Sequence, residues 1–316
     1  HMLDQTSSTP DTMQKSIVAA LTQIQTIIVG KPEQIKLAAC CLLSSGHCLI
    51  EDLPGVGKTT LAHALARVFG LHFSRIQFTS DLLPADILGV SIFNPKNQQF
   101  NFHPGPVFAN CVLADEMNRA TPKTQSALLE AMEEGQITID GTTRQLQQPF
   151  FVIGTQNPLD QSGTFPLPES QLDRFMMKLK LGYPDQKAER ELLAGQNRQR
   201  LLQSMPASMT IDQLLLLQHN VDQIHVSESL LDYVQLLVAK TRDKQLFVYG
   251  LSPRAALSLL KAARAWALMN GRDFVEPGDI KAVFLAISSH RLIVAEQHSK
   301  SVEHLLEQLL SQTPIP

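Results

Sequence analysis

The chain has 316 residues, of which 44% are hydrophobic and 18% charged, and its formal net charge is −3 at pH 7. This composition excludes a largely disordered chain, and the length suits two compact domains. The near-neutral charge gives no support to a dedicated binder of nucleic acid or acidic membranes.

Cysteine usage and hydropathy favour a cytoplasmic protein. The sequence contains four cysteines: Cys40, Cys41, Cys48 and Cys111. None has Cys-x-x-Cys spacing, so buried free thiols are favoured over a structural zinc site, as expected in a reducing compartment. No apolar run approaches the ~18 residues that a membrane span needs, and the N-terminus has no signal-peptide pattern.

The N-terminal region begins with a polar segment and continues with helical periodicity. Residues 1–14 are expected to form a disordered tail, in which His1-Met2 resembles a remnant of an expression tag. From Lys15 to Leu43 apolar residues recur at helical spacing, interrupted by Gly30-Lys31-Pro32. This pattern predicts two helices joined by a turn.

Short apolar runs then alternate with amphipathic segments. The predicted strands are His47–Glu51, Phe73–Phe78, Cys111–Ala114 and Phe150–Gly154. The predicted helices between them cover Thr59–Phe69 and Thr121–Glu134. Strands that alternate with helices are typical of an α/β fold with a mostly parallel sheet.

Two stretches depart from this alternation. Val90–Gly105 carries alternating apolar residues around Asn94-Pro95-Lys96-Asn97, and Gln136–Leu146 does so around Asp140-Gly141. Asp-Gly between two alternating runs is a strong hairpin signal. Both stretches are predicted to be β-hairpins inserted into the α/β core.

The character of the chain changes beyond Tyr183-Pro184-Asp185. The helical segments there include Leu214–Leu217, Leu230–Val238, Ala255–Leu268 and Ile280–Ile287. Strand patterns nearly vanish. We therefore expect an α/β domain over residues 15–184 and an all-helical domain over residues 185–316.

The segment Asp52-Leu53-Pro54-Gly55-Val56-Gly57-Lys58-Thr59 lies between a predicted strand and a predicted helix. Glycines there let backbone N–H groups converge on phosphate oxygens at a helix N-terminus. Lys58 is expected to reach the β- and γ-phosphates, and the Thr59 hydroxyl to bind Mg²⁺. The strict pattern has Gly in place of Asp52. A dinucleotide-binding loop is excluded because Thr60 stands where its third glycine is required.

Polar residues close the two later strands. Asp115, at the end of its strand, is placed to hold Mg²⁺ through water, and Glu116 to polarise the water that attacks the γ-phosphate. Asn157 follows the strand that ends near Gly154, where its amide could orient the same water. A turn-forming role for Asn157 before Pro158 is the alternative.

Together these elements resemble an AAA+ ATPase of the MoxR family over essentially the whole chain, from Val29-Gly30 onward. The more specific motifs are Asp115-Glu116-Met117-Asn118-Arg119-Ala120, Pro168-Glu169-Ser170-Gln171-Leu172-Asp173-Arg174-Phe175 and Leu251-Ser252-Pro253-Arg254-Ala255. The resemblance implies an AAA+ P-loop core with inserted hairpins, followed by a helical lid domain. The two hairpins correspond to the helix-2 insert and the pre-sensor-1 insert of this clade.

The resemblance also implies roles for individual residues. Walker A corresponds to Lys58 and Thr59, Walker B to Asp115 and Glu116, sensor 1 to Asn157 and sensor 2 to Arg254. The nucleotide-binding set further includes Val29 and Gly30 near the adenine, and Pro54, Gly55, Val56, Gly57 and Thr60. Arg174 would be the arginine finger that reaches a neighbouring subunit's γ-phosphate, and Arg119 is a weaker intersubunit candidate.

The implied activity is Mg²⁺-dependent hydrolysis of ATP to ADP by a ring, usually a hexamer. Family members resemble chaperones that assemble or activate target complexes, often with a von Willebrand factor A partner, which here would be a separate protein. A magnesium-chelatase-like motor subunit and a nucleic-acid translocase of the same clade are alternatives, although the Gln136–Leu146 hairpin offers only Arg144 to nucleic acid. A non-catalytic ATP-binding scaffold would be favoured by degraded motifs, and none is seen.

Overall fold

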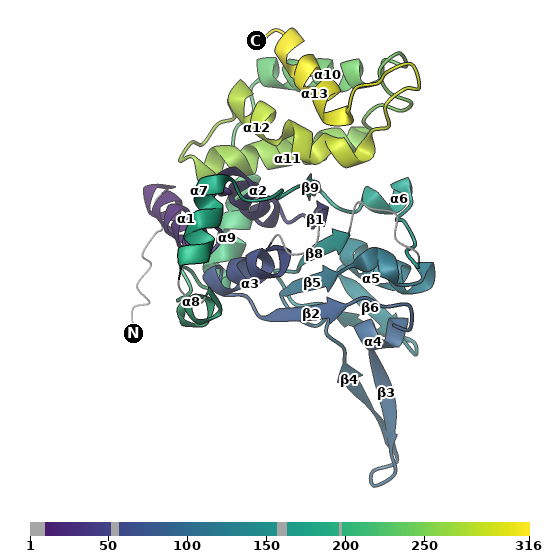
Figure 1. The fold of residues 1–316 in the computed structure, drawn as a ribbon. Helices are drawn as coiled ribbons and strands as arrows, with labels where there is room; N and C mark the ends of the chain where they lie inside the picture. Colours follow the sequence, from purple (N-terminus) through teal and green to yellow (C-terminus); the bar gives the residue numbers. More distant parts are fainter. Residues whose placement is uncertain (1–9, 52–56, 157–162, 196–197) are drawn as a thin grey trace.

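The computed structural model describes residues 10–51, 57–156, 163–195 and 198–316. Its central sheet has five parallel strands in the order β2-β5-β8-β1-β9 (Figure 1). The bounds are β1 Cys48–Glu51, β2 Phe73–Gln77, β5 Cys111–Asp115, β8 Phe151–Gln156 and β9 Met177–Leu179. The predicted parallel α/β sheet is thus confirmed. The edge strand β9 was missed, because its three residues have a lysine at their centre.

Side chains of the central strands alternate between two hydrophobic cores. In β5, Cys111 and Leu113 face one core, whereas Val112 and Ala114 face the other. The first core is covered by α1 (Pro10–Gln25), α2 (Pro32–Leu43) and α3 (Lys58–Val68), and the second by α4 (Pro84–Leu88) and α5 (Pro122–Glu134). Because strands buried on both faces need apolar residues at every position, they read as continuous apolar runs in the sequence.

Helix α1 begins at Pro10, so the expectation of a disordered tail over residues 1–14 is wrong for residues 10–14. Proline suits the first turn of a helix, where its missing N–H costs nothing, and Asp11 complements the positive helix end. Met13 packs against the main core. Residues 1–9, including His1-Met2, lie outside the described residues.

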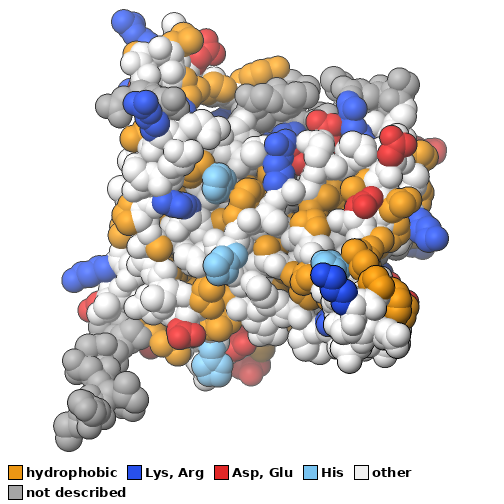
Figure 2. Space-filling view, turned by 90° about the horizontal axis from the view of Figure 1, so that it is seen from below, with side chains coloured by type: hydrophobic (Ala, Val, Ile, Leu, Met, Phe, Trp, Pro, Cys, Tyr) orange, Lys and Arg blue, Asp and Glu red, His pale blue; other side chains and the backbone are white. Residues whose placement is uncertain are grey.

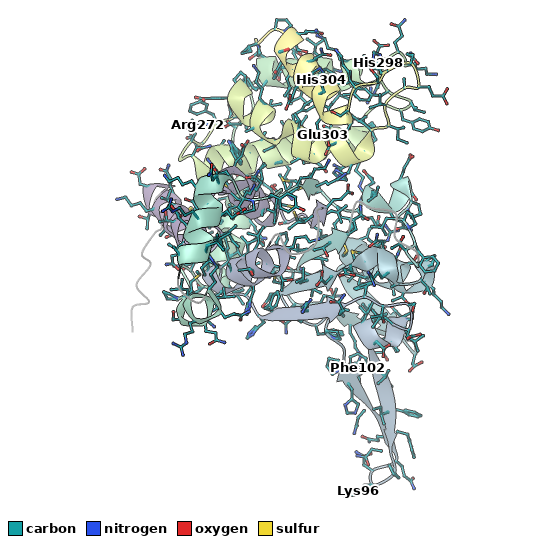
Figure 3. The ribbon with its side chains drawn as sticks, viewed as in Figure 1. Lys96, Phe102, Arg272, His298, Glu303 and His304 are labelled. Carbon is teal, nitrogen blue, oxygen red and sulfur yellow. The ribbon has the colours of Figure 1, made fainter. Side chains whose placement is uncertain are left out.

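Both predicted hairpins are present. The first pairs β3 (Gly89–Asn94) with β4 (Gln99–Pro104), and the second pairs β6 (Gln136–Ile139) with β7 (Thr142–Gln145). The second turns at Asp140-Gly141, where both residues have positive φ, of 51° and 77°. The β3–β4 hairpin projects away from the sheet, with Lys96 at its tip and Phe102 nearer its base (Figures 1 and 3).

Helices dominate the chain after β9, as predicted. Their bounds are α7 Gln186–Ala194, α8 Arg198–Ser204, α9 Ile211–Val221, α10 Glu228–Thr241, α11 Pro253–Met269, α12 Pro277–Ser288 and α13 Val302–Gln312. Helices α10 to α13 gather at the end of the molecule opposite the β3–β4 hairpin (Figure 1). In the described part of the chain, no helix has the length and apolar character required to cross a bilayer.

All four cysteines are buried free thiols, which confirms the interpretation of their spacing. Burial raises the pKa of Cys40 and of Cys111 to about 12. Both therefore stay protonated and act as small apolar side chains in the core.

Candidate functional site

The carboxyl ends of β1, β8 and β5 meet at one edge of the sheet. Glu51 of β1 pairs in register with Gln156 of β8, and Gly154 of β8 pairs with Ala114 of β5. The Gln156 amide donates to the Glu51 carboxylate at 2.8 Å. In parallel α/β sheets, ligands bind outside this edge. The topology thus brings together the ends of the three strands that the predicted Walker A, Walker B and sensor 1 motifs follow.

The phosphate-loop prediction falls partly on described residues. Gly57 has φ +92°, a left-handed conformation that favours glycine, and it precedes the first residue of α3, Lys58. The Lys58 side chain is buried, whereas Thr59 is exposed and Thr60 half-buried. Asp52 to Val56, with the predicted Pro54 and Gly55, lie outside the described residues.

Asp115 and Glu116 are linked by a third residue, Thr155. The Thr155 hydroxyl donates to Asp115 Oδ1 at 2.8 Å and accepts from the Glu116 backbone N–H at 2.9 Å. Thr155 is fully buried in β8, and Asp115 is also buried at the end of β5. One hydroxyl therefore fixes both the carboxylate of Asp115 and the backbone of Glu116. Thr155 was not predicted as a site residue, because a threonine in a strand gives no signal of its own.

A cationic side chain lies against the second oxygen of Asp115. Arg75 Nη2 lies 2.6 Å from Asp115 Oδ2 and 3.1 Å from Gln77 Oε1. A guanidinium in this position shows that the carboxylate end of Asp115 accommodates a positive charge. Carboxylate and hydroxyl oxygens are donors that suit Mg²⁺, so the predicted pair of Asp115 and Thr59 fits that metal.

Glu116 adopts a backbone conformation that is uncommon for its residue type. Its φ is +54°, in the left-handed region, where it precedes the short helix η1 (Met117–Arg119). Such conformations cluster at functional sites. The Glu116 carboxylate forms an ion pair with Arg119, 2.5 Å from Nε. Arg119 thus engages the predicted catalytic carboxylate of its own chain.

A polar hollow of about 520 Å³ opens beside this ion pair. Glu116 and Arg119 line it together with the end of β2, from Gln77 to Ser80, and with Gly163. The hollow therefore lies next to the side chain expected to polarise water. Asn157, the predicted sensor 1, lies outside the described residues.

The two predicted phosphate-reaching arginines lie together. Arg174 Nε lies 3.1 Å from one carboxylate oxygen of Glu133, and Arg254 Nη1 lies 3.7 Å from the other. Arg174 follows the short helix α6 (Glu169–Leu172), Arg254 is in the first turn of α11, and Glu133 is in the last turn of α5. Both arginines were predicted from the sequence as site residues. Glu133 was not, because an acidic residue on an exposed helix face is common.

Gly30 allows close packing at the turn between α1 and α2. Its φ is +79°, and a Cβ atom built there would lie 2.8 Å from Ala188 Cβ in α7. Val29 beside it is half-buried. The turn thus joins the first helices to the start of the C-terminal helical region. The predicted adenine contact of Val29 and Gly30 stays a prediction.

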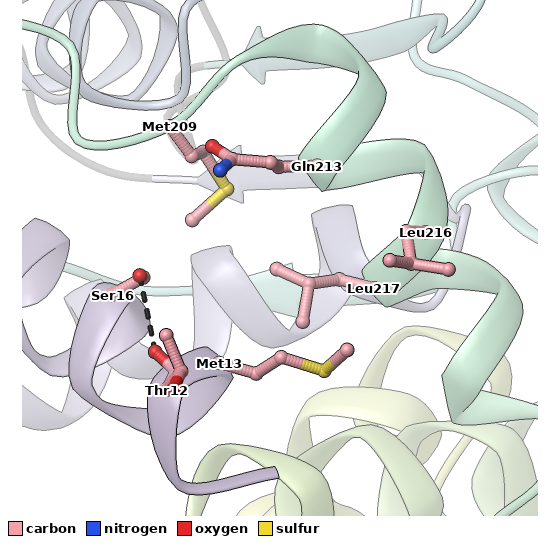
Figure 4. Close-up of a pocket in the computed structure, with 7 residues that line it drawn as sticks. All are labelled: Thr12, Met13, Ser16, Met209, Gln213, Leu216 and Leu217. Carbon is pink, nitrogen blue, oxygen red and sulfur yellow. Dashed lines mark hydrogen bonds between the residues drawn. The ribbon is translucent and has the colours of Figure 1, made fainter. Parts of the chain in front are cut away.

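A separate hollow of about 50 Å³ lies between α1 and α9 (Figure 4). Its lining includes Met13, Met209 and Leu217, and none of the described residues that line it is charged. A triphosphate needs cationic and N–H groups, so this small apolar hollow does not match a nucleotide.

Comparisons with known proteins agree with this geometry. The family described as ATPase family associated with various cellular activities (AAA) matches residues 47–177, and the AAA lid domain matches residues 239–309. The uncharacterized protein YeaC of Bacillus subtilis is 44% identical over 300 residues, which cover 94% of each chain. Chaperone MoxR1 of Mycobacterium tuberculosis is 40% identical over 312 residues, covering 94% of this chain and 81% of MoxR1. A crystal structure from Cytophaga hutchinsonii, assigned as an ATPase, aligns with a TM-score of 0.88 at 37% identity over 97% of both chains.

Proposed function

Since this chain belongs to the MoxR family of AAA+ ATPases, we propose that it is an ATP-driven chaperone that remodels, assembles or activates partner protein complexes. The chaperone role rests on its similarity to MoxR1, which carries that name. We further propose that it acts in the cytoplasm with a separate von Willebrand factor A domain protein.

The arrangement that best supports hydrolysis is the linkage of Asp115, Thr155 and Glu116. Lys58 would bind the β- and γ-phosphates of ATP, and Thr59 and Asp115 would hold Mg²⁺, which neutralises charge on those phosphates. Glu116 would accept a proton from the attacking water, oriented by Asn157. For that, the ion pair of Glu116 with Arg119 must open, because the guanidinium occupies a carboxylate oxygen that would contact the attacking water.

Completion of the site requires a second subunit in this proposal. Arg174 would reach the γ-phosphate of a neighbour in a ring, most commonly a hexamer in this class. Arg254 contacts the same carboxylate, Glu133, as Arg174 does, so we assign both arginines to the same nucleotide. An arginine finger contributes a factor of ~10³ or more to turnover.

The two predicted domains have distinct tasks in this scheme. Residues 15–184 would bind and hydrolyse the nucleotide, and residues 185–316 would form the lid. The contact between Gly30 and Ala188 lies across this boundary. A change in the position of the lid would therefore alter the packing of the turn that is proposed to lie near the adenine.

A nucleic-acid translocase receives less support. Arg144, the basic residue of the second hairpin, stacks on the ring of Phe102, 3.9 Å from its centroid. Lysine and arginine side chains are scattered over the face shown in Figure 2 and form no single basic patch on that face. Electrostatic binding to a phosphate backbone would need a concentrated basic surface. Among the described residues, no specific feature favours a magnesium-chelatase-like role.

The Glu116→Gln variant tests the proposed hydrolysis. We expect it to bind ATP with nearly wild-type affinity and to lose at least 100-fold in turnover, since it lacks the proton acceptor. Binding is measured with a fluorescent ATP analogue, and turnover by phosphate release. Glu296→Gln, an exposed change of the same charge in the C-terminal region, serves as the control. Unchanged turnover in Glu116→Gln would refute the role given to Glu116.

A further inference from the structure

We propose that Glu133 is a positioning residue that holds Arg174 and Arg254 as one two-pronged clamp for the neighbouring subunit's γ-phosphate. The inference rests on the proposed function, because it needs a nucleotide bound by a neighbour. It adds a residue that belongs to none of the predicted motifs.

The carboxylate of Glu133 bridges the two arginines. Its two oxygens contact different arginines, Oε2 with Arg174 and Oε1 with Arg254. These arginines are 80 residues apart in the chain and come from α11 and the segment after α6. Glu133 itself is in the last turn of α5. A carboxylate at the end of α5 is therefore the group that brings both guanidinium groups to one place.

A second carboxylate, that of Asp173, links Arg254 to a third arginine, Arg291, and so extends this network of ion pairs. Asp173 Oδ2 lies 3.8 Å from Arg254 Nη1, and Asp173 Oδ1 lies 2.7 Å from Arg291 Nε. Arg291 is nearly buried, and its guanidinium also donates to the backbone oxygens of Met176 and Phe175. Arg291 thus anchors Asp173, which gives the network a rigid end in the core.

The charge balance of the network suits an anion. Three arginines share two carboxylates, which leaves one excess positive charge. The Arg254 side chain is 61% exposed and that of Arg174 is 25% exposed, so the positive charge is accessible from outside the chain. Guanidinium groups bind phosphate through paired N–H donors in a fixed plane, and holding that plane in advance reduces the entropy lost on binding.

An exposed ion pair by itself contributes little to stability, so Glu133 acts mainly on the positions of the two guanidinium groups. Without Glu133, two guanidinium groups of like charge would repel each other and separate. The fold would be kept, whereas the geometry at the neighbour's phosphate would be lost. A misplacement of about 1 Å in a catalytic group can lower a rate by ~100-fold.

Subunit mixing tests this inference. Glu133→Gln alone is expected to lower kcat for ATP about tenfold, with KM for ATP changed less than about twofold, because each site keeps its own phosphate loop. In a 1:1 mixture with Glu116→Gln subunits, turnover should recover severalfold above that of Glu133→Gln alone. The Glu116→Gln neighbour lacks hydrolysis but supplies an intact clamp. A defect confined to the chain's own site would not recover in this way.

The controls separate this inference from the proposed function. Glu134→Gln changes the adjacent carboxylate, which forms no ion pair with either arginine, and should keep wild-type turnover. Light scattering with ATP verifies that each variant forms a ring of unchanged mass. Arg174→Ala mixed with Glu116→Gln tests the trans finger itself.

Each outcome of the mixing experiment decides between the two proposals. Recovery with both Arg174→Ala and Glu133→Gln supports the clamp. Recovery with Arg174→Ala but not with Glu133→Gln overturns the clamp and leaves the proposed function standing. No recovery with Arg174→Ala overturns the trans finger and the clamp together. Wild-type or higher turnover in Glu133→Gln alone also overturns the clamp.

Discussion

The guanidinium of Arg75 lies 2.6 Å from the carboxylate of Asp115, on the neighbouring strand of the central sheet. The two residues come from β2 and β5, in which Gln77 and Asp115 are paired in register. Thr155 holds the other oxygen of the same carboxylate. A cationic group thus already pairs with the carboxylate that is proposed to bind Mg²⁺.

Replacing Arg75 is expected to ease Mg²⁺ binding. Arg75→Gln removes a positive charge that competes with the metal, so half-maximal binding of a fluorescent ATP analogue should need about 1.5- to 5-fold less Mg²⁺. The effect is small because the Arg75 side chain is 48% exposed, and exposed ion pairs contribute ~0.2–1 kcal/mol. Lys96→Gln, at the tip of the hairpin, is the matched control. A higher Mg²⁺ requirement would mean that Arg75 supports Asp115 instead of competing for it.

Thr155 offers a prediction on both stability and turnover. Thr155→Val removes a buried hydroxyl and leaves Asp115 Oδ1 and the Glu116 N–H without their shared partner. We expect a loss of ~1–3 kcal/mol in the free energy of unfolding, measured with urea, because unsatisfied buried polar groups are costly. Turnover should fall about tenfold, since Glu116 is no longer fixed. Thr155→Ser should restore most of both, and a serine variant as impaired as valine would contradict the role of the hydroxyl.

The sheet could be predicted from sequence because both of its faces are covered. Runs such as Cys111–Ala114 contain only apolar residues, and their ends are marked by turn residues or charges. The hairpin at Asp140-Gly141 was also readable from its turn chemistry. Strand β9 was not, because Met177–Leu179 is short and alternates with lysine at an edge. Pro10 and Asp11 suit the first turn of α1, but the packing of Met13 against the main core is a long-range contact that no local pattern reveals.

The phosphate-binding and acidic motifs could likewise be read from the sequence, since their residues are close together along the chain. Side chains that act through long-range contacts could not. Arg75 meets Asp115 across 40 residues, and Glu133 meets Arg254 across an even longer separation. Neither contact has a local signature, because its geometry is set by strand order and by how the lid packs on the core. The parts of the site missing from sequence reasoning are therefore those built by topology.

His47 gives the protein a pH-dependent stability. The ring is buried between β8 and α5, where Nδ1 accepts from the Val152 N–H at 3.0 Å and Nε2 lies 3.3 Å from the Met132 carbonyl. Burial lowers the pKa of His47 to about 4, from its usual value of 6.5, although the bond to Met132 opposes this shift. Below pH 6.5 the unfolded chain therefore binds more protons than the folded chain, and stability falls as the pH drops from about 6.5 to 4.

The expected loss from His47 reaches about 3 kcal/mol at pH 4. His47→Gln keeps one donor and one acceptor without a titrating group, so its free energy of unfolding should decline less steeply over this range. Urea unfolding at several pH values measures the slope. In His47→Gln the free energy of unfolding should still decline somewhat as the pH falls, because burial also lowers the pKa of His290, to about 3. His103→Gln, exposed on the hairpin, is the control, and identical slopes for His47→Gln and wild type would rule out His47 as the source.

Turnover should depend on protein concentration, because the proposed site is shared between subunits. In the proposed site, one subunit contributes Glu116 and the phosphate loop. Its neighbour contributes Arg174 and Arg254, which are both bound by Glu133. An isolated chain lacks the neighbour's arginines, so we expect its turnover to be ~10³-fold or more below that of the ring. Specific ATPase activity is measured across a dilution series, and light scattering at each step reports the fraction in rings. Activity per chain should follow that fraction, and constant activity through ring dissociation would show that one chain completes the site alone.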